Sequence, residues 1–118
     1  MTRTPPSAGA DPALARQAPL FAALGDATRL RLLTLLCAGG ALSIAQLTAG
    51  TDLSRQGVTK HLQVLAGAGL VHDVRVGRER RWRLQPARLD EARATLERIG
   101  RQWDDALARL RAFVEEDG

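Results

Sequence analysis

Residues 54–66 carry polar side chains at a spacing that suits the recognition of nucleic-acid bases. On a helical projection at 100° per residue, one side carries the core face, formed by Val58, Leu62, Leu65 and Ala66. The opposite side carries only hydrogen-bonding groups, namely Gln56, Thr59, Lys60 and Gln63. A helix with such a face fits the major groove of DNA, which accepts one helix with its side chains. An ordinary amphipathic surface helix has the same spacing, so this segment alone leaves both interpretations open.

The residue types in this segment match particular groups on DNA. Gln56 and Gln63 can pair with adenine edges, whereas arginine and lysine can pair with guanine or a phosphate. Thr59 can reach a phosphate or a thymine methyl group, and the free backbone N–H groups behind Ser54 favour a phosphate. The DNA contacts expected from this segment are Ser54, Arg55, Gln56, Thr59, Lys60 and Gln63.

A cluster of arginines follows directly, where the hydrophobic period changes to two. Residues 70–76 and 80–84 alternate on either side of a loop at 77–79, which predicts a two-stranded hairpin. Its arginines are Arg75, Arg78, Arg80, Arg81 and Arg83. Such a hairpin can hold the phosphate backbone or place an arginine in the minor groove. The contacts expected from it are Arg75, Arg78, Arg80 and Arg81. Arg80 shares its strand side with Trp82 and can therefore pack partly on the core, and Glu79 is expected to orient a neighbouring arginine.

The distribution of charge favours a polyanionic partner. The chain has a net charge of +4 and a pI of about 10.9. Eight basic and three acidic residues lie between Thr51 and Arg88, so the excess of positive charge is concentrated there. A basic patch in an otherwise nearly neutral chain is typical of a protein that binds nucleic acid. Charge alone leaves open a solvated surface without a partner.

The composition argues against several other classes of protein. A chain of 118 residues with 45% hydrophobic residues is one domain with a core. Its single cysteine can form neither an internal disulfide nor a Cys-rich zinc site. No stretch suits a membrane span and the N-terminus lacks the apolar core of a secretory signal, so a cytoplasmic location is expected. No spacing pairs a nucleophile with a base, and no glycine-rich phosphate loop is present, so we expect no enzymatic activity, metal or cofactor.

The first half of the chain is expected to supply the core behind the polar segment. Residues 1–18 are predicted to be a flexible arm, and Pro19 is predicted to start a short helix that ends at Gly25. Asp26 is a predicted N-cap for a leucine-rich helix over residues 27–38, whose leucines cover most of its circumference. We therefore expect this helix to be central and buried, with Cys37 as a small buried hydrophobe and not a ligand or sensor.

Two short helices joined by a tight turn follow. Ser43 and Gln46 match the capping box Ser-x-x-Gln, which predicts a helix to about Ala49. After a turn at residues 51–53, Ser54 caps the polar helix, which is expected to run to about Ala66. This arrangement predicts a helix-turn-helix.

The C-terminal segment, about residues 87–115, is predicted to be one long helix with a heptad pattern. Apolar residues recur every seven positions in two series three residues apart, over more than three heptads. Such a helix, about 40 Å long, exceeds what a small domain can cover. A second copy of the chain is therefore the preferred partner, and packing on its own core alone is the alternative. The residues expected at the interface are Leu89, Leu96, Ile99, Trp103, Leu107, Leu110 and Phe113.

Several motifs resemble the arsenical-repressor (ArsR) family of regulators. Residues 20–33, reading LFAALGDATRLRLL, are similar to the opening of that family, and so are 53–65, LSRQGVTKHLQVL, and 68–71, AGLV. Residues 77–84, GRERRWRL, look like the family's wing. The resemblance covers about residues 19–114, and the segment 103–110 is similar to a branch whose members lack metal sites.

The resemblance implies a homodimeric, winged helix-turn-helix DNA-binding repressor. The expected fold is mostly α with a small β-hairpin, and residues 19–116 form the domain with its long C-terminal dimerisation helix. Metal-sensing members carry a Cys-x-Cys pair where residues 44–49 here read IAQLTA, and another family site needs a histidine that the last helix lacks. The expected partners are double-stranded DNA on a palindromic operator and a second copy, with no membrane and an unknown inducer. Three alternatives remain: a metal- or thiol-responsive sensor with an unrecognised site, a dimeric protein-interaction module without DNA binding, and an RNA-binding protein. Trp82 is the one aromatic residue in the basic region of this chain, so the sequence offers no platform on which single-stranded RNA bases could stack.

Overall fold

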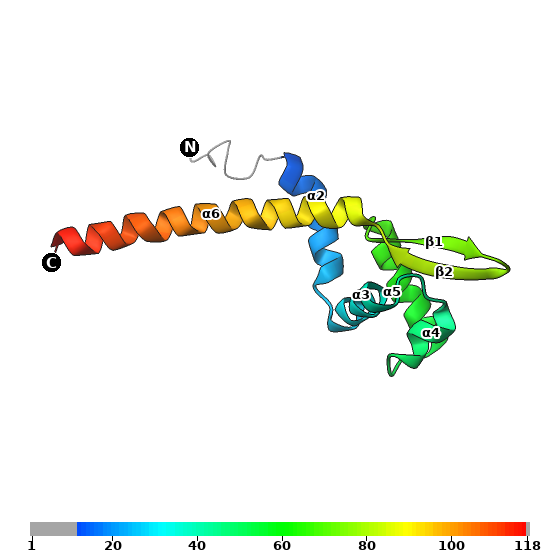
Figure 1. The fold of residues 1–118 in the computed structure, drawn as a ribbon. Helices are drawn as coiled ribbons and strands as arrows, with labels where there is room; N and C mark the ends of the chain where they lie inside the picture. The colour runs from blue at the N-terminus through cyan, green and yellow to red at the C-terminus, as the bar shows by residue number, and fades with distance from the viewer. Residues whose placement is uncertain (1–11, 118) are drawn as a thin grey trace, which may run out of the picture.

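The computed structural model describes residues 12–117. Its elements in order are α2 (Pro12–Leu24), α3 (Ala27–Gly39), α4 (Ile44–Ala49), α5 (Arg55–Gly67), β1 (Val71–Val76), β2 (Glu79–Leu84) and α6 (Pro86–Asp117) (Figure 1). The two strands pair antiparallel, with Val71 opposite Leu84 and Val76 opposite Glu79. The predicted fold class, mostly helical with one small hairpin and a long last helix, is confirmed.

The predicted helix caps explain where α3 and α4 begin. The Asp26 carboxylate accepts a hydrogen bond from the N–H of Arg29 at 3.0 Å. At α4 the capping box is complete, because the N–H of Gln46 donates to Ser43 Oγ at 3.2 Å and the N–H of Ser43 donates to Gln46 Oε1 at 2.9 Å. These bonds satisfy N–H groups that a helix start otherwise leaves without partners.

The core lies behind α5 and is made mainly by leucines. Val58, Leu62 and Leu65 of α5 are fully buried, as the helical projection predicted. Their buried neighbours in the core come from α2, α3, α4, the hairpin with the residue before it, and α6. They include Leu20, Leu32, Leu36, Leu47, Leu70, Trp82 and Ala92. The backbone of Leu42 exchanges two hydrogen bonds with Trp82, at 2.9 and 2.7 Å, and so ties the hairpin to the domain.

Helix α2 starts earlier than the sequence predicted. The prediction of a helix beginning at Pro19 is wrong, since residues 12–18 are already helical. The arm predicted for 1–18 therefore does not extend over these residues, and residues 1–11 lie outside the described part. Proline at position 19 removes one backbone donor, but packing on α6 offsets that loss. Leu20 and Ala23 are buried, and the buried Thr95 hydroxyl of α6 donates to the side-chain oxygen of Gln17.

Helix α3 is buried on one side only, which corrects the expectation of a central, buried helix. Leu32, Leu33 and Leu36 are buried, whereas Leu30 is 47% exposed. Cys37 is also exposed, so the prediction of a buried cysteine is wrong. The neighbours of α3 are α2, α5 and β2, and none of them covers the side that carries Leu30 and Cys37.

The first turns of α6 pack on the domain and the rest projects from it. Leu89, Ala92 and Thr95 face the core or α2, and from Leu96 onward the large apolar side chains are exposed. Figure 1 shows α6 crossing α2 and then continuing alone to the C-terminus. The molecule consequently measures 67 × 35 × 23 Å. The expectation that this helix outreaches its own domain is confirmed.

Candidate nucleic-acid interface

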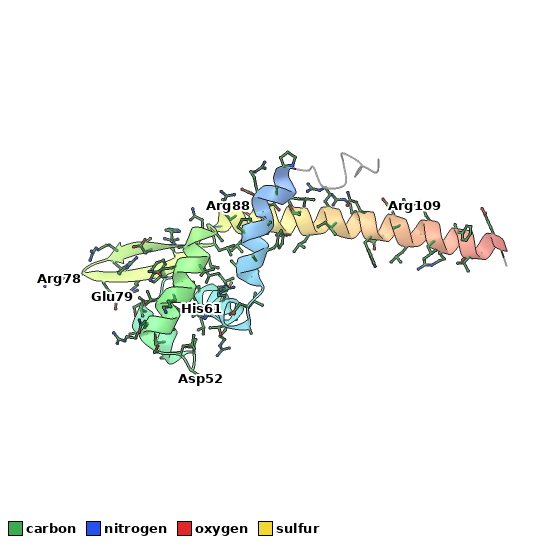
Figure 2. The ribbon with its side chains drawn as sticks, turned by 180° about the vertical axis from the view of Figure 1, so that it is seen from behind. Asp52, His61, Arg78, Glu79, Arg88 and Arg109 are labelled. Carbon is green, nitrogen blue, oxygen red and sulfur yellow. The ribbon has the colours of Figure 1, made fainter. Side chains whose placement is uncertain are left out.

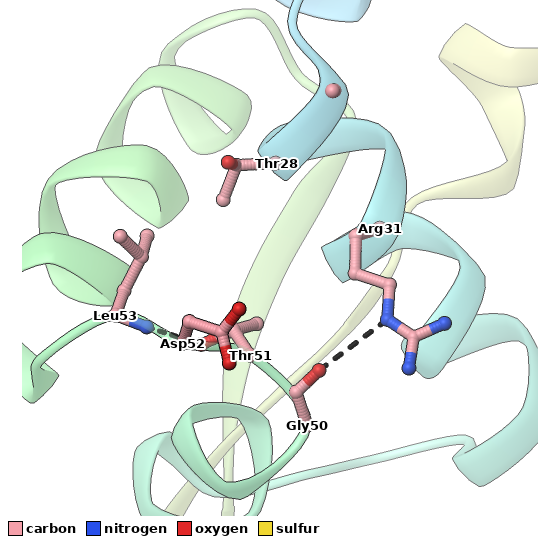
Figure 3. A pocket seen from close by; sticks show the side chains of 7 residues that line it. Thr28, Arg31, Gly50, Thr51, Asp52 and Leu53 are labelled. Atoms are coloured by element: carbon pink, nitrogen blue, oxygen red, sulfur yellow. Dashed lines mark hydrogen bonds between the residues drawn. The ribbon is translucent and has the colours of Figure 1, made fainter.

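The turn between α4 and α5 is held in place from α3. The Arg31 Nε donates to the Gly50 carbonyl at 3.3 Å, and the N–H of Leu53 donates to Thr51 Oγ1 at 3.2 Å (Figure 3). These residues border a cavity of about 380 Å³ between α3 and the turn. Ser54 then caps α5 by accepting a hydrogen bond from the N–H of Gly57 at 3.1 Å. The first turn of α5 thus begins from a fixed loop.

The predicted polar face of α5 is present and points to solvent. Gln56, Lys60 and Gln63 are exposed, as are Ser54 and Arg55 at the helix start. Thr59 is half-buried, and its hydroxyl donates to the Arg55 carbonyl at 2.8 Å. The structure therefore brings all six predicted residues of this segment to one exposed end and face. Of these six side chains, only that of Thr59 already donates a hydrogen bond to another of the described residues.

The hairpin projects beside this face and ends in a tight two-residue turn. Val76 pairs with Glu79, so Gly77 and Arg78 form the turn. Gly77 has φ of 66°, a conformation that favours glycine and matches the first central position of a type II′ turn. Figure 2 shows Arg78 and Glu79 at the tip, beyond the body of the domain. An exposed arginine at this tip can reach a phosphate that α5 does not contact.

Two of the predicted hairpin contacts are paired within the strands. Arg80 Nε donates to Asp73 Oδ2 at 2.8 Å, and the Arg80 guanidinium lies over the Trp82 ring at 4.7 Å from its centroid. The hydrogen bond from Arg80 lowers the pKa of the Asp73 carboxyl below its usual value. The Glu79 carboxylate accepts from Arg81 Nε at 2.6 Å, as the sequence predicted for a neighbouring arginine. Both pairs leave part of each guanidinium free to donate to another acceptor.

Sequence reasoning missed the contact that links α5 to the start of α3 and the end of α2. Arg29 donates through Nε to the Ala23 carbonyl at 2.6 Å, and its NH1 group lies 3.3 Å from His61 Nδ1. The N–H of Arg29 lowers the pKa of Asp26 through the capping hydrogen bond. The residue type of Asp26 before the leucine-rich helix indicated the cap, but it could not show that the side chain of Arg29 reaches α5.

The apolar stripe of α6 divides into two parts. Leu89 is half-buried and packs against the core of its own chain. The remaining six predicted residues are exposed, from 40% at Leu107 to 65% at Trp103. They are Leu96, Ile99, Trp103, Leu107, Leu110 and Phe113, and Val114 extends the stripe. An exposed stripe of this size is unfavourable in water and marks an interaction surface.

Over residues 12–117, no three His, Cys, Asp or Glu side chains gather as a metal site would require. In the same range no helix is both long and apolar enough to cross a membrane.

A short helix, a tight turn, an exposed polar helix and an arginine-bearing hairpin define a winged helix-turn-helix protein. A helix-turn-helix domain family matches residues 24–74. The HTH-type transcriptional regulator Rv2034 of Mycobacterium tuberculosis is 34% identical over 96 residues, covering 81% of this chain and 86% of the relative. The arsenical resistance operon repressor of Escherichia coli is 36% identical over 67 residues, 57% of each chain. Among solved structures, an ArsR-like transcriptional regulator from Rhodococcus sp. RHA1 is 43% identical, with a TM-score of 0.76 over 87% of this chain and 94% of its own. The chain belongs to the ArsR family of helix-turn-helix transcriptional regulators.

Proposed function

We propose that the protein is a homodimeric repressor that binds a palindromic operator in double-stranded DNA. The observation that carries this proposal is the polar face of α5, which is exposed while Val58, Leu62 and Leu65 on its other side are fully buried. A helix anchored in this way can enter the major groove without disturbing the core. Its similarity to the operon repressor of Escherichia coli supports repression as the mode of regulation.

In this proposal the two parts of the interface have different tasks. Gln56 and Gln63 read base edges, with Arg55, Thr59 and Lys60 on bases or phosphates and Ser54 beside a phosphate at the helix start. The hairpin arginines hold the flanking backbone or minor groove, with Arg78 foremost because it stands at the tip. Affinity then comes largely from the hairpin and sequence choice largely from α5.

The exposed stripe of α6 is proposed to pair two copies of the chain. A heptad of apolar residues needs a partner helix of matching pattern, and a second copy offers the same stripe. A two-fold dimer presents two α5 helices about one turn of DNA apart. The operator is accordingly expected to contain two inverted half-sites.

Fluorescence anisotropy on the DNA upstream of the protein's own gene tests this function. Tight, sequence-dependent binding that weakens steeply with salt is expected, because each phosphate contact releases a counterion. A shuffled DNA of equal length and composition is the control. Binding that is absent at low salt, or that does not change with salt, contradicts the proposal.

A further inference from the structure

A second cavity lies at the end of α5 that is remote from Ser54. It has a volume of about 210 Å³ and is bounded by α2, the end of α5 and the start of α6. Its lining residues include the apolar Pro19, Leu20, Ala66 and Ala68, together with Arg16 and Arg88. Figure 2 shows Arg88 near the crossing of α2 and α6, well separated from Asp52 at the turn before α5. Because α5 has 13 residues, about 20 Å of helix separates this cavity from the start of α5 at Ser54.

Glycine at position 69 allows Arg88 to lie against the wall of this cavity. Gly69 has φ of 79°, in the region that side chains rarely adopt. A Cβ on this residue would come within 2.9 Å of Arg88 Cγ and 3.1 Å of Arg88 Nε. The Arg88 side chain therefore lies directly against the backbone of Gly69, and any larger residue at position 69 would displace it.

The balance of charge around the cavity suits a single negative charge. Arg88 NH1 has one ion-pair partner, Glu91, at a long distance of 3.4 Å. Arg16 has no hydrogen-bond or ion-pair partner among residues 12–117. Two guanidinium groups and one carboxylate leave one uncompensated positive charge. The carbonyl end of α5, which carries partial negative charge, makes a doubly charged anion less favourable.

We propose that this cavity binds a small organic carboxylate. Arg16 and Arg88 donate hydrogen bonds to the carboxylate, and Pro19, Leu20 and Ala66 contact the apolar body of the ligand. Such a ligand ties α2 and α6 to the last turn of α5, so its binding is coupled to the position of the polar helix. The coupling to DNA rests on the proposed function, whereas the binding itself does not.

NMR titration of the full-length protein with sodium benzoate tests the site without DNA. At constant ionic strength set with sodium chloride, we expect saturable shifts at the amides of Gly67, Ala68 and Gly69. Arg16→Gln and Arg88→Gln should each weaken benzoate binding about tenfold, as the loss of one charged hydrogen-bond partner predicts. The matched control is Arg93→Gln, since Arg93 also lies exposed on α6 with a glutamate partner, Glu97 at 3.9 Å. It should leave the affinity unchanged.

Three results would overturn the assignment. The first is that sodium chloride alone reproduces the amide shifts. The second is that the wild type and Arg16→Gln/Arg88→Gln bind benzoate with equal affinity, with both proteins folded by circular dichroism. The third is that the wild type binds inorganic phosphate and benzoate with equal affinity. Arg16→Lys and Arg88→Lys, which keep the charge, should retain part of the binding.

Addition of benzoate to a preformed protein–DNA complex then tests the coupling. A change in DNA affinity that Arg16→Gln/Arg88→Gln abolishes supports it. Unchanged DNA affinity at saturating benzoate overturns the coupling. Failure to bind any DNA contradicts the proposed function and leaves the benzoate result standing.

Discussion

Side chains of the interface differ in how much of their hydrogen-bonding capacity the chain already uses. Gln56 and Arg78 are exposed, one on α5 and the other at the hairpin tip. Thr59 and Arg80, by contrast, donate to the Arg55 carbonyl and to Asp73. Groups of the first kind are available to DNA without any rearrangement of the chain, so substitution at these positions separates base reading from backbone contact.

Replacement of Gln56 and of Arg78 by alanine should have different consequences. Gln56→Ala should reduce discrimination between the best and next-best base by about 1–3 kcal/mol, because the amide can pair with an adenine edge. Arg78→Ala should weaken all sequences alike and reduce the slope of log K against log[salt] by about 0.9. Anisotropy on cognate and scrambled DNA at four salt concentrations measures both quantities. If the two variants lose specificity and salt dependence equally, the division of tasks is wrong.

Arg80 should contribute less to the salt dependence than Arg78, because Asp73 already pairs with it. Arg80→Ala should leave the slope nearly unchanged, and Asp73→Asn should make it steeper by releasing Arg80 toward a phosphate. The double variant identifies the cause, since the gain from Asp73→Asn must disappear when Arg80 is absent.

The lowered pKa of Asp73 fixes the pH range of this effect. The Asp73 carboxyl is charged at any pH above the usual aspartate pKa of about 3.9. The ion pair with Arg80 is lost only when the pH falls through the lowered pKa. The difference in salt slope between the wild type and Arg80→Ala should therefore be the same from pH 5 to pH 8. A marked pH dependence within that range would contradict the pairing.

At the scale of elements, local patterns predicted well where capping or periodicity decides the structure. Ser43, Ser54 and Asp26 cap the helices that the sequence assigned to them. The hairpin turns at the predicted place, but its turn has two residues, Gly77 and Arg78, and the predicted loop residue Glu79 already belongs to β2. Prediction failed where packing between elements decides. The hydrogen-bonded pair Gln17–Thr95 and the burial of Leu20 sustain α2 through a proline, and no local signal in the chain reveals either.

The same limit applies to α3 and to the interface. The sequence predicts that the leucine-rich α3 is central and buried, yet among the described residues only one of its sides has neighbouring elements, and Cys37 lies on the other. The sequence indicated every exposed polar residue of α5, because helical period alone assigns them to one face. It could not indicate that Arg29 reaches His61 or that Asp73 pairs with Arg80, since those contacts join separate elements.

The two serine caps provide a prediction at this scale. Ser54→Ala and Ser43→Ala each remove a side-chain acceptor at a helix start and should each lower the free energy of unfolding by about 1 kcal/mol. Only Ser54→Ala should also weaken DNA binding at a temperature where both variants are fully folded, because α5 alone is proposed to enter the groove. Urea denaturation and anisotropy measure the two effects. An equal loss of DNA affinity in Ser43→Ala would show that the effect is general destabilisation.

For the whole molecule, its elongated shape and the exposed apolar stripe of α6 imply that one chain is half of the functional unit. The core ends near Thr95, and α6 continues beyond it with Leu96, Trp103 and Leu110 exposed. A monomer would leave this stripe in water, whereas a dimer covers it and sets the distance between two α5 helices. A substitution that abolishes dimerisation should consequently also abolish the dependence of DNA affinity on the spacing of the half-sites.

Leu110→Glu tests that link, with Ala108→Glu as its control on the opposite side of the same exposed helix. Both variants add one carboxylate to α6, but only Leu110 lies in the stripe. Leu110→Glu should sediment as a monomer of 12.7 kDa and remain folded, because its side chain contacts no core residue of its own domain. Ala108→Glu should sediment as a dimer. On DNA, the dimer should lose most of its affinity when 5 base pairs are inserted between the half-sites, since half a turn places them on opposite faces of the duplex. The monomeric variant should bind a single half-site weakly and be indifferent to the insertion. A Leu110→Glu protein that remains dimeric, or a wild type that tolerates the insertion, would show that α6 does not set the geometry of the two recognition helices.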